Sequence, residues 1–216
     1  MTVRAVLLAL APALLGGAMV VSGAAERPAA PLPAISPHDW APQPGDLVLT
    51  AADDLIGANI RGASGSNAVF SHVGLVVLRD GAPAVIEATP FGSGKVAFAD
   101  FDAFTRNPET TELLVLRPRT PIDLGRLAHE AERLAAAGVE FDYGFDMADA
   151  SELYCAELVY HLLGAAGVDL ASVPWTQMYV PLHGDRNLVV PDAFAHTPAL
   201  EPVFRRRLPP PATPGA

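Results

Sequence analysis

The chain has 216 residues, of which half are hydrophobic and 18% are charged, and its formal net charge is -10. This length predicts one globular domain with flexible ends. Phosphate binding needs clustered Lys and Arg, and the only basic run is Arg205 to Arg207, so no nucleic-acid partner is expected. The one cysteine, Cys155, cannot form an internal disulfide, which leaves either a small core residue or a reactive thiol.

The N-terminal residues 1–25 contain one Arg, then an apolar stretch, then small residues. This pattern predicts a secretory signal peptide, and therefore export to the periplasm or cell envelope. An uncleaved anchor that associates with the membrane is the alternative, since about 20 apolar residues can span a bilayer. The Pro-rich stretch 26–42 predicts an extended linker, residues 43–200 the folded domain, and residues 201–216 a disordered Pro-rich tail.

Short apolar runs in the first half of the domain predict strands. LVLT follows a turn at Gly45 and Asp46, and TELLVLRP ends at Pro118. Between them, HVGLVVL and PAVIEA are joined by Arg79, Asp80 and Gly81, which predicts a β-hairpin. A Gly-rich polar segment, GANIRGASGSN, predicts a loop between the first two strands.

Two later segments have helical spacing. Asp123 can cap LGRLAHEAERLAAA, and Gly138 supplies its stop. A second helix is predicted from near Tyr154 through CAELVYHLLGAAG, which places Cys155 in its first turn. The predicted fold class is α+β, with a small, mainly antiparallel sheet packed against the helix that carries the cysteine.

Three residues form a candidate catalytic set. A helix N-terminus favours the thiolate form of Cys155, and His72, at the start of its strand, is the candidate base. Glu87 interrupts an apolar strand and would lie near His72 across the hairpin, where a carboxylate could orient the imidazole. Taken singly, each has a structural alternative: a core cysteine, a histidine bonded to backbone, and a carboxylate paired with Lys95 or Arg79.

The segments GDLVLT, FSHVGLVV, VIEATP, FDYGF and YCAELVY occur in that order. They resemble the circularly permuted papain-like amidase and peptidase family of the YiiX/YaeF type, which is related to NlpC-type cell-wall peptidases. The resemblance covers roughly residues 43 to 170, and it implies a permuted papain-like (NlpC-like) fold. The stretch between Thr50 and Phe70 departs from the expected pattern, because it is unusually rich in Gly, Ser and Ala.

The resemblance implies a role for each matching residue. Cys155 would be the nucleophile, His72 the base and Glu87 the orienting residue, while Tyr143 and Tyr154 would line the substrate cleft. The backbone N–H of the cysteine would contribute to an oxyanion hole. No metal or organic cofactor is implied.

The implied reaction is amide hydrolysis through an acyl-enzyme, with peptidoglycan peptides of the cell envelope as the expected substrate. Two other classes of function stay open on the same fold. One is a lipid or acyl-group hydrolase or acyltransferase, and the other is a binding module of the envelope that does not catalyse a reaction.

Overall fold

The computed structural model describes residues 40–52, 62 and 68–207. The predicted signal peptide, the linker up to residue 39, most of the Gly-rich loop and the chain after residue 207 lie outside the described residues. Among the helices that are described, none is long and apolar enough to cross a membrane.

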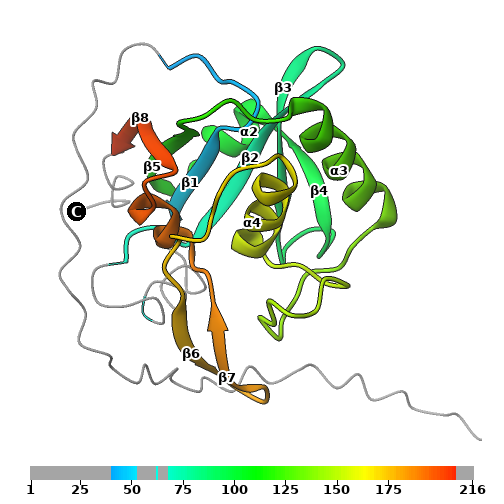
Figure 1. The fold of residues 1–216 in the computed structure, drawn as a ribbon, viewed down its shortest axis with the longest axis vertical. Coiled ribbons are helices and arrows are strands. Elements are labelled where there is room, and N and C mark those ends of the chain that lie inside the picture. The colour runs from blue at the N-terminus through cyan, green and yellow to red at the C-terminus, as the bar shows by residue number, and fades with distance from the viewer. Residues whose placement is uncertain (1–39, 53–61, 63–67, 208–216) are drawn as a thin grey trace, which may run out of the picture.

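Six strands form one antiparallel sheet in the order β4-β3-β2-β1-β5-β8 (Figure 1). Their bounds are β1 (Leu47–Ala52), β2 (His72–Arg79), β3 (Ala82–Ala88), β4 (Val96–Asp100), β5 (Thr110–Pro118) and β8 (Leu200–Arg207). A separate hairpin consists of β6 (Thr176–Val180) and β7 (Gly184–Leu188). The predicted α+β class with a mainly antiparallel sheet is confirmed.

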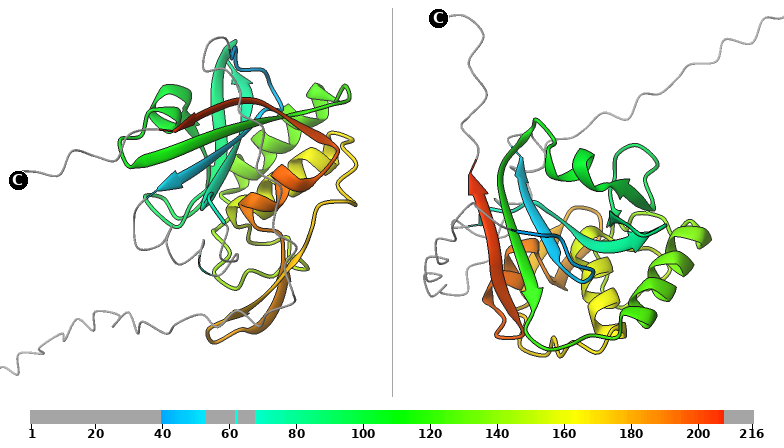
Figure 2. Two further views of the ribbon diagram at one scale, coloured as in Figure 1. Left: turned by 90° about the vertical axis from the view of Figure 1, so that its left-hand side faces the viewer. Right: turned by 90° about the horizontal axis from the view of Figure 1, so that it is seen from above.

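The helices cover both faces of this sheet. They are α2 (Phe101–Thr105), α3 (Leu124–Ala137), α4 (Cys155–Ala165) and the 3-10 helix η1 (Pro191–His196). Figure 2 shows α2 on the opposite face of the sheet from α3 and α4.

Alternation of side chains along the strands produces two apolar layers. Leu47 and Leu75 join the larger core, with α3 and α4. Val48 and Val76, their neighbours in sequence, join a smaller cluster with Phe104 of α2. The main sheet is therefore buried on both faces, which explains why β1 and β2 are nearly continuous apolar runs.

The predicted hairpin between β2 and β3 is confirmed. Asp80 and Gly81 have positive φ angles of 52° and 80°, as a two-residue turn of the tight primed type requires. Leu75 pairs with Ile86, so the far end of β3, with Glu87, lies beside the start of β2. The turn thus sets the register that brings Glu87 to His72.

The chain beyond residue 200 forms a strand, so the predicted disordered tail is wrong for residues up to Arg207. β8 pairs with β5 along the edge of the sheet. Arg205 and Arg207 both bond the carboxylate of Glu112, and Arg206 donates to the carbonyl of Thr105 at 2.6 Å. Partners distant in sequence therefore convert a basic run into an ordered edge strand.

The domain also starts earlier than residue 43. The indole of Trp40, inside the predicted linker, lies 5.6 Å from the Phe204 ring and 5.5 Å from the Phe101 ring, measured between centroids. Its Nε1 donates to Asp46 at 2.9 Å. The last residues of the predicted linker are thus part of the packed domain.

Asp46 joins three segments through one buried carboxylate. Besides Trp40, it accepts from the backbone N–H of Gln43 at 2.9 Å and from Arg117 at 2.6 and 2.8 Å. Asp46 therefore forms an ion pair with Arg117 of β5 in addition to its predicted role in a turn.

We predict that Asp46→Ala lowers the free energy of unfolding by about 3 kcal/mol or more, because it leaves the Arg117 guanidinium without its partner at a largely buried site. Glu201→Ala breaks the exposed pair with Arg119 and should cost less than about 1 kcal/mol. Urea denaturation of both variants measures the difference, and equal losses would contradict this assignment.

Candidate active site

The three candidate catalytic residues come from three elements that meet. Cys155 is the first residue of α4, His72 the first residue of β2, and Glu87 lies near the end of β3. Helix α4 contacts both β2 and β3. The helix start and the strand end are thus brought together by the packing of α4 on the sheet.

His72 and Glu87 form the contact that the hairpin predicts. Nε2 of the imidazole lies 2.6 Å from Oε2 of the carboxylate. Arg79, an alternative partner for Glu87, instead pairs with Glu132 at 3.4 Å and stacks over the Phe98 ring. The carboxylate therefore holds Nε2, which leaves Nδ1 as the ring nitrogen available to the thiol.

Cys155 interacts with His72 through its side chain. Burial lowers the pKa of His72, but hydrogen bonds to the side chains of Cys155 and Glu87, together with their charges, outweigh it and raise this pKa from 6.5 to about 10. The imidazole is consequently protonated at neutral pH. The imidazolium therefore lies between the sulfur of Cys155 and the carboxylate of Glu87.

Phe104 provides one wall around the imidazole. Its ring centroid lies 5.7 Å from that of His72. A Cβ on Gly74 would come within 3.1 Å of the Phe104 ring and within 2.4 Å of a Val85 methyl. Glycine at position 74 therefore allows the aromatic ring to lie beside the candidate base.

Asp192 anchors the segment that leads into β2. Its two carboxylate oxygens accept from the backbone N–H groups of Val69 at 3.0 Å and Phe70 at 2.9 Å. Sequence reasoning missed this residue, because it lies more than a hundred positions from the segment that it holds and no local motif marks it. Asp192 is a positioning residue for the strand that carries His72.

The two tyrosines proposed for the cleft have different environments. Tyr143 is 60% exposed, and its hydroxyl donates to the carbonyl of Pro90 at 3.5 Å, beside the turn after β3. Its role in substrate binding stays a prediction. Tyr154 is only 2% exposed, and its hydroxyl bonds both backbone groups of Val189. The prediction that Tyr154 lines the cleft is wrong, because its side chain is buried in the core and bonds the backbone there.

Glu157 faces away from Cys155 across α4. It accepts from the N–H of Tyr154 at 3.4 Å, as a structural role at the helix start requires. Burial, reinforced by the negative charges of Asp142, Asp146 and Asp149, outweighs that hydrogen bond and raises the pKa of Glu157 from 4.5 to about 8. This acid is therefore protonated at neutral pH.

The raised pKa of Glu157 predicts a pH dependence of stability. Between pH 4.5 and about 8 the folded state keeps a proton on Glu157 that the unfolded state has released. The contribution of Glu157 to the free energy of unfolding is therefore complete below pH 4.5 and is lost as the pH rises through 8. Glu157→Gln should remove this loss, on the order of a few kcal/mol. Urea denaturation of both proteins from pH 4.5 to 9 tests it, and parallel profiles would contradict it.

Comparison with known families adds to this geometry. A model for the permuted papain-like amidase enzymes of the YaeF/YiiX type, family C92, matches residues 41–204. The chain belongs to the permuted papain-like amidase family. The amidase is therefore a cysteine hydrolase, and the resemblance seen in its motifs is confirmed.

One solved structure, metalloprotein yiiX from Escherichia coli O157:H7, is similar to the amidase with a TM-score of 0.66 and 21% identity. The match covers 79% of this chain and 100% of that one, and it shows the same fold. No curated protein matches. That relative is described as a metalloprotein, but the described residues of the amidase contain no group of three or more His, Cys, Asp and Glu that could hold a metal ion.

Proposed function

We propose that this amidase is an exported enzyme that hydrolyses amide bonds of peptidoglycan peptides through Cys155, His72 and Glu87. The observation that carries the proposal is the imidazole of His72, which bonds Glu87 through Nε2 and interacts with the cysteine at the helix start. This is the arrangement of nucleophile, base and orienting group that acyl transfer uses.

The proposed reaction begins with attack of the Cys155 thiolate on the substrate carbonyl carbon. The backbone N–H of Cys155 has no partner inside the helix, so it can donate to the oxyanion. The imidazolium then gives its Nδ1 proton to the departing amine, and a thioester remains. Water, deprotonated at Nδ1, attacks the thioester and releases a carboxylic acid and the thiol.

The substrate and the location of the enzyme rest on sequence arguments. Residues 1–25 have the composition of a secretory signal or membrane anchor, which supports placement in the periplasm or cell envelope. The resemblance to NlpC-type cell-wall peptidases supports peptidoglycan peptides as substrates by analogy.

Trapping the acyl-enzyme tests the proposed function. The full chain is incubated with a cell-envelope extract, quenched in acid, and its intact mass is measured. A muropeptide fragment attached to Cys155, and absent from Cys155→Ser, supports the proposal. A fatty-acyl adduct would instead indicate the lipid class of substrate, and an unmodified thiol in an extract that contains intact peptidoglycan would count against catalysis.

Glu87→Gln is predicted to lower kcat/KM by roughly 100-fold, because the amide no longer stabilises the imidazolium by charge. Since Glu87 contributes to the raised pKa of His72, the alkaline limb of the pH–rate profile should also move to lower pH. Glu132→Gln, which removes a surface partner of Arg79, is the matched control. Steady-state kinetics on muropeptides would refute the orienting role if both variants retained wild-type profiles.

A further inference from the structure

The outer face of α4 carries a cavity of about 440 Å³ whose wall includes Glu157, Tyr160, His161 and Trp175. At about 100° per residue, Glu157 and Tyr160 lie on the side of the helix opposite Cys155. The cavity is therefore distinct from the candidate active site, and the proposed reaction uses none of these side chains.

Two aromatic rings form a corner in this cavity. The centroids of Tyr160 and Trp175 are 6.1 Å apart and their planes are inclined by 75°. Trp175 remains 46% exposed, although it follows a proline at the edge of the core. The pair is edge-to-face, and both rings line the cavity, where the half-exposed Trp175 offers an aromatic surface of the kind that binds organic cations.

A buried carboxyl group completes the corner. Glu157 is only 4% exposed, yet it lines the cavity. Its Oε2 accepts a long 3.4 Å hydrogen bond from Tyr154, and the nearby aspartates Asp142, Asp146 and Asp149 oppose its ionisation. An acid in this environment gains from a positive partner, because a cation stabilises the carboxylate that burial disfavours.

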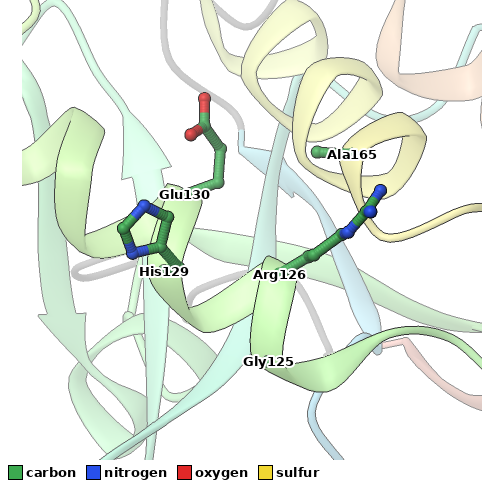
Figure 3. A pocket seen from close by; sticks show the side chains of 5 residues that line it. All are labelled: Gly125, Arg126, His129, Glu130 and Ala165. Atoms are coloured by element: carbon green, nitrogen blue, oxygen red, sulfur yellow. The ribbon is translucent and has the colours of Figure 1, made fainter.

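We propose that this cavity binds an organic ammonium group, held against the Tyr160 and Trp175 rings and beside the carboxylate of Glu157. A neighbouring cavity of about 350 Å³ provides a contrast. Figure 3 shows that it is lined by Arg126, His129 and Glu130 of α3, with Ala165 on α4. Among the described residues, its lining places an arginine beside its one acid and contains no Phe, Tyr or Trp ring, so the ammonium group is assigned to the aromatic cavity.

Binding should be linked to proton release. Glu157 must lose its proton to pair with the cation, so affinity should increase about tenfold from pH 6 to 7 and about fivefold from pH 7 to 8, and then level off. The other ionisable groups around the site are His161 in the cavity with its partner Glu130 on α3, the three aspartates, and Arg186 of β7, 3.9 Å from Asp146. A Glu157 variant leaves these residues in the sequence.

Calorimetric titration of the full chain with choline tests the proposal. The control ligand is 3,3-dimethyl-1-butanol, the neutral carbon isostere of choline. We expect choline to bind with the stated pH dependence, and the isostere to bind more weakly and with no pH dependence. Equal affinity for the two probes, or no choline binding at millimolar concentration, would overturn the proposal.

Three variants assign the interaction to residues. Trp175→Ala should weaken choline binding about fivefold to tenfold, whereas Tyr179→Ala, an equally exposed aromatic on β6, should have no effect. Glu157→Gln should abolish the pH dependence. A cooperative unfolding transition in urea confirms that each variant is folded. A Glu157→Gln protein that keeps wild-type affinity at every pH would exclude the carboxylate.

Discussion

Replacing Cys155 with alanine is expected to lower kcat for amide hydrolysis by about 10,000-fold or more, because no other group in the proposed site can form the acyl-enzyme. The thiol is 7% exposed within the larger core. Removal of one sulfur atom should therefore cost only about 1 kcal/mol of stability. The assay compares turnover of muropeptides with unfolding in urea, so that lost activity can be separated from lost folding.

Cys155→Ser provides the matched variant for that experiment. Serine keeps the size and the hydrogen-bonding capacity of the side chain, but its hydroxyl is a much weaker nucleophile than a thiolate. We expect a comparable loss of activity with near-normal stability. Substantial hydrolysis by a folded Cys155→Ala protein would show that a different group performs the chemistry.

Replacing His72 with asparagine is expected to lower kcat/KM by about 100-fold to 10,000-fold. Asparagine can still accept and donate hydrogen bonds, but it cannot exchange a proton near neutral pH. The matched control is His161→Asn, since His161 sits 2.7 Å from Glu130 in a pair like that of His72 and Glu87 but on the outer face of α4. Its activity should match wild type.

The proposed role of His72 as proton donor also predicts the pH–rate profile of the wild-type enzyme. Proton donation to the leaving amine requires the imidazolium, and the pKa of His72 is raised to about 10 by Cys155 and Glu87 against the effect of burial. Activity should thus persist well above pH 6.5 and decline only as the pH approaches 10. An alkaline limb near pH 6.5 would contradict the proposed ion pair.

The local parts of the fold and site were predictable from sequence because their signals are local. Asp80 and Gly81 encode a tight turn, and the turn sets the register that places Glu87 against His72. The helix start at Cys155 likewise follows from spacing within one segment. These features need no knowledge of tertiary contacts.

The errors arose where tertiary contacts decide the structure. The run Arg205 to Arg207 looks like a solvated tail, and only its pairing with Glu112 on β5 makes it a strand. Tyr154 adjoins the nucleophile in sequence, but its hydroxyl bonds the backbone of Val189 in the core. Asp192 could not be found at all, because its partners follow from packing alone.

The reactivity of the single thiol tests the central claim most directly. Because Cys155 is the only cysteine, its alkylation by iodoacetamide can be followed by intact mass in the wild type and in His72→Asn, with N-acetylcysteine as the free-thiol reference. At pH 6 the wild-type protein should react at least about tenfold faster than the reference, and His72→Asn should lose that advantage. A wild-type rate no faster than the reference and unchanged by His72→Asn would contradict the assignment of Cys155 and His72 as nucleophile and base.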